Sequence, residues 1–280
     1  MADRSRPKRV ARVAEVLRRT QLTPHMIRVV FGGEGLRGFP VGEFTDHYVK
    51  LQFPPPGAGY AVPYDVETVQ RELPREQWPV SRTYTVRSWD AVAGELTIDF
   101  VHHGDEGVAG PWAAAAQPGD RLQLFGPGGA YAPSVLADWH LLVGDEAALP
   151  AIAAALPRVP SGAQARVFLE VAGPEEEQDL PVAPGVELHW VHRGSAVPGE
   201  ALVAAVRSAQ LPTGTAQAFV HGEAHLVREL RSLVRVDLAV PRELMSVSGY
   251  WRLGSTEDRW QAEKRDWNAA IEAQEQVAAR

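Results

Sequence analysis

The pattern of apolar residues changes once along this chain, near Trp139, and the change limits the folds that the chain can adopt. Before it, short apolar segments separated by glycine and proline predict strands. These segments are residues 10–17, 25–31, 47–53, 81–89, 95–102 and 120–125. No helical period precedes Pro111, so they favour a six-stranded antiparallel barrel, with residues 54–79 as a surface excursion.

After Trp139 the runs HLLV, ARVFLEV, VELHWV and AQAFVH alternate with helical segments such as EAALPAIAAAL and EAHLVRELRSLV. Apolar strands that alternate with helices predict a parallel sheet covered on both faces. We therefore expect a barrel domain over residues 1–133, a parallel α/β domain over 134–254 and a helical tail over 255–280.

The composition excludes several kinds of site. The 280 residues include no cysteine, which rules out thiolate metal sites, disulfides and cysteine nucleophiles. A net charge of −7 argues against nucleic-acid binding. No apolar run approaches the roughly 20 residues of a membrane span, and no signal peptide follows the basic N-terminus. We expect a cytoplasmic monomer that binds neither nucleic acid nor membranes.

Two literal motif matches do not predict function. GEGLRG, at 33–38, has dinucleotide-binding spacing, but FPVGEF follows it and does not open a helix, so we interpret it as a loop. In HGEAH, His221 and His225 have the spacing of metal ligands, but there is no third ligand. We interpret these histidines as a strand end and the first turn of a helix, and we expect no metal site.

The segment SRTYTVR combines arginine, an aromatic ring and hydroxyl groups. On a strand, Arg82 and Tyr84 would face one way, and Thr85 and Arg87 the other. A flavin could use a flat side chain against its ring, a hydroxyl near its reactive nitrogen and guanidinium groups at its phosphates. An ordinary barrel strand shows the same alternation, so this segment alone leaves both interpretations open.

A second segment, DFVHHGDEGVAGPW, runs from a strand into a glycine-rich turn and then into a helix with Pro111 in its first turn. Free backbone N–H groups at such a helix start can bind a pyrophosphate. The segment follows the arginines within the same barrel, which strengthens the flavin interpretation.

Together with PGDRLQLFGPGG, LLVGDEAALPAI and HGEAHLVRELRSLV followed by GYWRLG, these segments make the chain resemble the siderophore-interacting proteins. These are FAD-dependent ferric-siderophore reductases related to the ferredoxin reductases. The resemblance implies a barrel that binds FAD, followed by an NAD(P)H-binding-like domain. It also implies reduction of ferric siderophores to release Fe(II) in the cytoplasm. The flavin would carry the electrons, so no catalytic side chain is expected.

The resemblance assigns cofactor binding to residues of three segments. They are Arg82, Tyr84, Thr85, Arg87, His103, Gly107, Ala109, Gly110, Trp112, Asp145 and Ala148. At the last segment, Asp145 and Glu146 would present two carboxylates that repel a pyrophosphate, and Ala147 replaces the family's usual Thr. How a nicotinamide cofactor would bind is therefore an open question.

Most ferric complexes of catecholate and carboxylate siderophores are anions, so the substrate pocket needs cations. We assign Lys50, Arg252 and Lys264 to it, the last two with support from the resemblance. Each has a plainer interpretation: a solvated lysine on a strand, an arginine packed at a sheet edge and a lysine that extends to solvent.

The tail beyond Gly254 predicts a helix capped by Ser255. Trp260, Lys264, Trp267 and Ile271 fall on one stripe of that helix, which should pack inward.

The resemblance leaves the electron donor as ferredoxin or NAD(P)H. A long C-terminal helix resembles the subgroup that takes electrons from a ferredoxin-like protein, so we predict slow reduction by NADH or NADPH. Two alternative functions stay open: a general NAD(P)H:flavin or quinone reductase, and a non-catalytic flavoprotein that binds siderophores.

Overall fold

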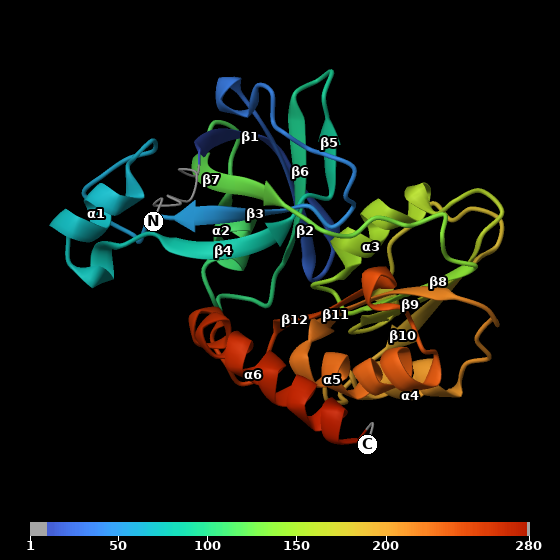
Figure 1. Ribbon diagram of the computed structural model, residues 1–280. Helices are drawn as coiled ribbons and strands as arrows, with labels where there is room; N and C mark the ends of the chain where they lie inside the picture. Colours follow the sequence, from blue (N-terminus) through green and yellow to red (C-terminus); the bar gives the residue numbers. More distant parts are fainter. Residues whose placement is uncertain (1–9, 279–280) are drawn as a thin grey trace, which may run out of the picture. The chain divides into compact units, whose positions relative to one another are not determined.

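The structure is a computed structural model and describes residues 10–278 (Figure 1). The chain divides into two compact units, Met1–Gly129 and Ala130–Arg280. No helix in the described part of the chain is both long enough and apolar enough to span a membrane.

The first unit is built on an antiparallel sheet with the strand order β4-β3-β7-β1-β2-β6-β5 (Figure 1). Its strands are β1 (Ala11–Thr23), β2 (Met26–Gly32), β3 (Tyr48–Phe53), β4 (Val80–Thr85), β5 (Ser88–Asp90), β6 (Glu95–Val101) and β7 (Arg121–Gly128). The core between them is apolar, with Phe31, Leu51, Ile98 and Leu124 fully buried. The predicted antiparallel architecture is confirmed, with seven strands in place of six.

The extra strand arises because predicted strand 81–89 is interrupted. The backbone N–H of Val86 donates to the carbonyl of His47 beside β3, whereas the N–H of Arg87 donates to Thr97 in β6. The chain therefore changes its partner strand between β4 and β5, which lie at opposite ends of the sheet order. Alternation of side chains cannot reveal such a change of partner.

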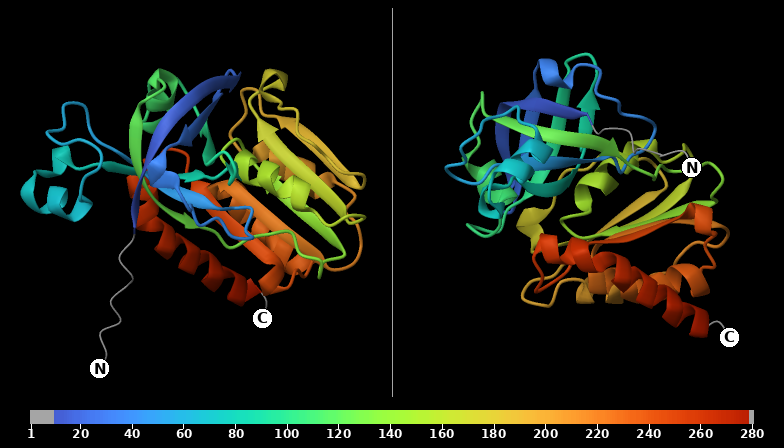
Figure 2. Two further views of the ribbon diagram at one scale, coloured as in Figure 1. Left: turned by 90° about the horizontal axis from the view of Figure 1, so that it is seen from above. Right: turned by 60° about the vertical axis from the view of Figure 1, so that its left-hand side comes forward.

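The excursion at 54–79 contains a helix that the sequence analysis did not predict. This helix, α1 (Val66–Glu72), begins at Asp65, whose carboxylate accepts a hydrogen bond from the Thr68 N–H at 2.8 Å. Only Val69 of the helix is buried. In Figure 2 the excursion projects from the strands of its own unit, as expected for a surface segment.

The second unit has a parallel sheet with the order β10-β9-β8-β11-β12. Its elements are β8 (Trp139–Gly144), α3 (Leu149–Ala155), β9 (Gln164–Val171), β10 (Val186–His192), α4 (Glu200–Ser208), β11 (Ala216–Glu223), α5 (Ala224–Ser232), β12 (Met245–Trp251) and α6 (Glu257–Ala278). Successive residues of β8 pack on opposite sides: Leu142 lies with α3, and Leu141 and Val143 lie with α4 and α5. The predicted parallel sheet with helices on both faces is confirmed.

Helix α6 comes after the edge strand β12 in the chain and contacts it (Figure 2). The predicted inward stripe is confirmed, because Trp260 is 0% and Ile271 6% exposed. Trp260 packs over Gly249, where an added Cβ would lie 2.9 Å from its ring. The predicted cap was wrong: Thr256 Oγ1, one residue after Ser255, accepts the Arg259 N–H at 3.4 Å.

Candidate functional site

The flavin-like segment of the first unit lies on β4 and just beyond its end. Arg82 and Tyr84 are half-buried, and Thr85 is buried. The Tyr84 ring packs against Phe100 with 4.4 Å between the ring centroids. The predicted alternation of side chains therefore applies to Arg82, Tyr84 and Thr85 on β4. It does not apply to Arg87, which lies after the end of this strand.

Arg87 lies beside the ion pair of a half-buried arginine, Arg28, with the buried Asp99. Arg28 holds Asp99 with two hydrogen bonds of 2.7 Å, from Nε and Nη2 to the two carboxylate oxygens. The Arg87 Nε is 3.9 Å from Asp99 Oδ2 and has no hydrogen-bond partner among the described residues. Burial lowers the pKa of Arg87. A buried guanidinium N–H without an acceptor fits an anionic group such as a flavin phosphate.

The glycine-rich turn leads into α2 (Ala109–Ala115), a helix of seven residues. His103 and Gly107 are exposed in the turn, and Gly107 has a φ of +80° that favours glycine. Gly110 lies against β6, where an added Cβ would be 3.1 Å from the Val101 carbonyl oxygen. Of the predicted cofactor residues in this segment, His103 and Gly107 have the most accessible positions.

The other two residues of this segment pack in the apolar core of the first unit. Ala109 is buried, and Trp112 stacks on Phe31 at 6.1 Å with nearly parallel rings. Trp112 also contacts Phe53 and Phe100. One face of the Trp112 ring is therefore already used in packing.

Lys50 lies on β3 directly opposite Thr83 of β4, and its Nζ donates to Thr83 Oγ1 at 3.0 Å. Thr83 and Thr85 point to the same side of β4 because two residues separate them. Lys50 is thus fixed on the strand beside the flavin-like segment, on the side that Thr85 faces.

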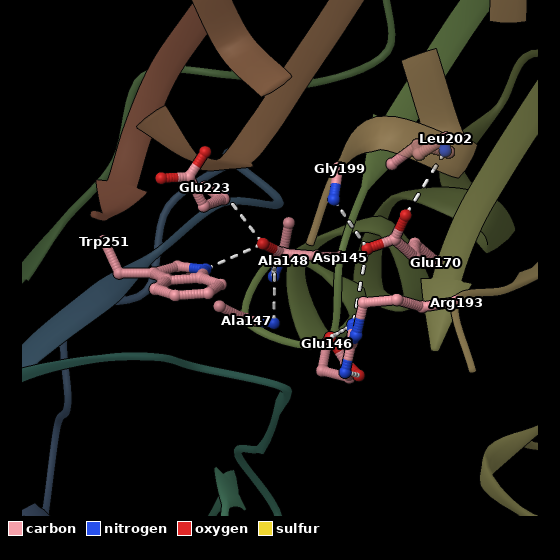
Figure 3. Close-up of polar contacts among 10 residues, drawn as sticks. All are labelled: Asp145, Glu146, Ala147, Ala148, Glu170, Arg193, Gly199, Leu202, Glu223 and Trp251. Carbon is pink, nitrogen blue, oxygen red and sulfur yellow. Dashed lines mark hydrogen bonds and ion pairs between the residues drawn. The ribbon is translucent and has the colours of Figure 1, made fainter. Parts of the chain in front are cut away.

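In the second unit, Asp145 follows β8 and accepts four hydrogen bonds (Figure 3). Its Oδ1 accepts the N–H groups of Ala147 at 3.0 Å and Ala148 at 3.3 Å. Its Oδ2 accepts the Glu223 N–H at 2.8 Å and the Trp251 Nε1–H at 2.7 Å. This carboxylate, 1% exposed, therefore joins the ends of β8, β11 and β12.

The space for this carboxylate depends on Gly222. A Cβ at that position would lie 2.6 Å from Asp145 Oδ2, and the φ of +137° is one that L side chains rarely adopt. Burial, reinforced by repulsion from Glu146, raises the pKa of Asp145 to about 7, although its four donors favour the ionised form.

The neighbouring Glu146 belongs to a separate ion-pair network (Figure 3). Arg193 donates to both of its oxygens, at 2.8 and 3.1 Å, and also to Glu170 at 3.3 Å. The fully buried Glu170 accepts the N–H groups of Gly199 and Leu202 at the start of α4. Glu170, which lies on β9, thus caps the N-terminus of α4.

The expectation that Asp145 and Glu146 present free carboxylates to a pyrophosphate was wrong. Both are engaged within the unit, one by backbone and indole donors and the other by Arg193. Ala148 is also completely buried, so its side chain offers no surface to a cofactor. Trp251 could have been singled out within GYWRLG, whereas no local signal marked Arg193.

The two predicted cations of this unit differ in their surroundings. Arg252 Nη1 lies 3.4 Å from Glu263 Oε2. Burial is the main cause that lowers the pKa of His221 to about 3, and the nearby positive charge of Lys264 adds to this shift.

His221 lies in β11 and His225 in the first turn of α5, as predicted from HGEAH. The described part of the chain has no group of three or more histidine, aspartate or glutamate side chains that could hold a metal ion.

Comparisons with known proteins agree across both units. A family model described as a siderophore-interacting FAD-binding domain matches residues 15–131, and one described as siderophore-interacting protein matches residues 137–254. Ferric vibriobactin reductase ViuB of Vibrio cholerae is 34% identical over 255 residues, which cover 90% of this chain and 93% of ViuB.

Two further relatives also match over most of this chain. The NADPH-dependent ferric-chelate reductase of Escherichia coli is 32% identical over 84% of this chain and 91% of its own. The siderophore-interacting protein SipS of Aeromonas hydrophila has a structure with a TM-score of 0.78 and 33% identity, over 93% of this chain and 98% of its own. This chain therefore belongs to the family of siderophore-interacting proteins.

Proposed function

We propose that this protein is an FAD-dependent reductase that releases iron as Fe(II) from ferric siderophores in the cytoplasm. The observation that carries the proposal is the pair of family matches over both units, together with the arginine and tyrosine segment on β4. Relatives over almost the whole length are named as reductases of ferric vibriobactin and of ferric chelates. Fe(II) is a poorer match than Fe(III) for hard oxygen ligands, so reduction weakens the complex.

The first unit would hold the cofactor. Tyr84 offers an aromatic face and Thr85 a hydroxyl, and Arg82 and Arg87 offer charged donors to the phosphates. The exposed turn with His103 and Gly107 would contact the adenine half. FAD, when bound, supplies the conversion of a two-electron donor into the single electrons that Fe(III) accepts. The residues orient the cofactor, and none needs to act as a general acid or nucleophile.

Lys50, Arg252 and Lys264 are proposed to attract the anionic ferric complex. The chain as a whole carries a net charge of −7, so binding of an anion needs such local positive charge. Arg252 is partly neutralised by Glu263, whereas the bond of Lys50 is to a neutral hydroxyl. Lys50 should therefore contribute the larger share.

The test is a transfer experiment with purified protein. The bound flavin is reduced without oxygen and mixed with a ferric catecholate siderophore in the presence of a chromogenic Fe(II) chelator. We expect rapid reoxidation of the flavin and up to two Fe(II) per flavin. The same siderophore loaded with Ga(III) is the control, because Ga(III) has similar size and charge but accepts no electron here. Equal flavin traces with Fe(III) and Ga(III) would refute the proposal.

The same experiment separates the two alternatives. A general NAD(P)H:flavin or quinone reductase should reoxidise as fast with a quinone as with the ferric complex, and Lys50→Gln should not slow it. A binding flavoprotein should bind both metal complexes equally and leave the flavin reduced.

A further inference from the structure

The parallel sheet of the second unit has one point where the chain reverses its direction across the sheet, between β8 and β11. From β8 the chain adds β9 and β10 on one side, and then β11 and β12 on the other. In such sheets, ligands bind outside the carboxyl ends of the strands at this point. In this protein Asp145, directly after β8, occupies that position (Figure 3).

Asp145 uses the donors that a phosphate would need. The N–H groups of Ala147 and Ala148, at the start of α3, both point to its Oδ1. The N–H of Glu223, at the end of β11, and the indole of Trp251 point to its Oδ2. These four donors come from three separate segments and converge on one buried carboxylate.

We infer that the Asp145 carboxyl group, by occupying all four of these donors, excludes the pyrophosphate of a nicotinamide dinucleotide from this turn, and is therefore a specificity-determining residue for the electron donor. Gly222 supports this inference, because only a residue without a Cβ leaves room for the carboxylate between β8 and β11. The obstacle is occupancy of the donors, not the repulsion by free charge that the sequence predicted. This inference rests on the proposed function, because an electron donor matters only to a reductase. Its test measures binding of NADP⁺ and does not use ferric reduction.

The test measures NADP⁺ binding by calorimetry to the FAD-loaded protein and to the variants Asp145→Asn and Asp145→Ser. Each variant replaces the carboxyl group by a group that carries no charge, and the shorter serine also empties most of its space. We expect the Kd for NADP⁺ to fall at least about tenfold in Asp145→Ser, since each freed donor can make a charge-assisted hydrogen bond. Inorganic pyrophosphate should compete with NADP⁺ in this variant.

Glu146→Gln is the matched control. It removes one negative charge from the same turn, but from a side chain held by Arg193 and not by the turn's amides. NADP⁺ should bind this variant about as weakly as it binds the unaltered protein. A folded Asp145→Ser that binds no more tightly than Glu146→Gln would overturn the inference.

A measurement on the unaltered protein covers the case in which the variants do not fold. In an NMR titration with NADP⁺, the amide signals of Ala147, Ala148 and Glu223 should stay in place, because Asp145 already occupies them. Movement of these three signals with saturation would show that a phosphate displaces the carboxylate, and would also overturn the inference. Neither result depends on whether the protein reduces ferric siderophores.

Discussion

The indole Nε1–H of Trp251 donates to Asp145 Oδ2 at 2.7 Å, although 106 residues separate them in the chain. The bond ties the end of β12 to the turn after β8, with β11 between these strands. Because the acceptor is buried, the indole replaces hydrogen bonds that water cannot supply.

Above a pH of about 7, where Asp145 is ionised, replacing Trp251 by Phe should therefore lower the free energy of unfolding by about 1.5–3 kcal/mol, the usual range for a hydrogen bond to a charged group. Urea unfolding checks this value. Trp139→Phe is the comparison, because its indole donates to the neutral Gly214 carbonyl at a longer 3.4 Å; Trp139 is more deeply buried than Trp251, so this variant also loses core packing. No measurable loss of stability in Trp251→Phe would contradict the prediction.

The pH dependence of stability should show two opposing contributions. Asp145, with its pKa raised to about 7, keeps a proton in the native state that the unfolded chain loses above pH of about 4. Its contribution to stability therefore falls as pH rises from about 4 to 7. His221, with its pKa lowered to about 3, stays neutral where the unfolded chain binds a proton. Its contribution falls as pH drops below about 6.5.

Single variants should separate these contributions between pH 4.5 and 6.5. In Asp145→Asn the free energy of unfolding should rise with pH, and in His221→Gln it should fall with pH. Urea unfolding at several pH values gives both slopes. If the free energy of unfolding changed with pH in the same direction in both variants, the assignment of the two contributions to Asp145 and His221 would be contradicted.

Retention of FAD should depend on Arg82. Replacing Arg82 by Ala removes a charge-assisted contact worth about 1.5–3 kcal/mol, or roughly tenfold to a hundredfold in Kd. Flavin fluorescence during titration of the apoprotein measures this change. Arg18→Ala is the control, because Arg18 pairs with Glu95 at the surface of the same unit. A colourless protein that takes up no added FAD would contradict the prediction from the start.

Binding of anionic ferric complexes should weaken in Lys50→Gln and, to a smaller extent, in Arg252→Gln. The loss should shrink at high salt, because salt screens exposed charges. Glu263→Gln should not weaken binding, since it removes the carboxylate that faces Arg252. Quenching of intrinsic fluorescence gives these affinities, and flavin absorbance verifies that FAD stays bound. Unchanged affinities in both cation variants would place the pocket elsewhere.

The electron donor can be identified by anaerobic stopped-flow reduction. We expect NADH and NADPH to reduce the flavin slowly and without saturation, because Asp145 occupies the turn where a pyrophosphate would bind. Reduced ferredoxin should react faster. Rapid, saturable bleaching by NADPH, as the name of the Escherichia coli relative suggests for that enzyme, would show that the dinucleotide binds by other contacts.

The sequence by itself determined the order of the elements. Apolar residues must reach a core from one face of a helix or strand, so their spacing records the element type locally. This explains why the antiparallel strands, the parallel sheet and the inward stripe with Trp260 and Ile271 were predictable. The residues of SRTYTVR were also found locally, but the departure of Arg87 from the strand was not.

Tertiary structure alone decided which charged groups are available to a ligand and which are held by partners within the protein. Asp145 and Glu146 look alike as neighbours in sequence, yet one is held by Glu223 and Trp251 and the other by Arg193. These partners lie on strands β11 and β12 or, for Arg193, directly after β10, so their positions depend on the order of the sheet. A buried carboxylate takes whichever donors the fold places around it, so its role cannot be predicted from its own segment.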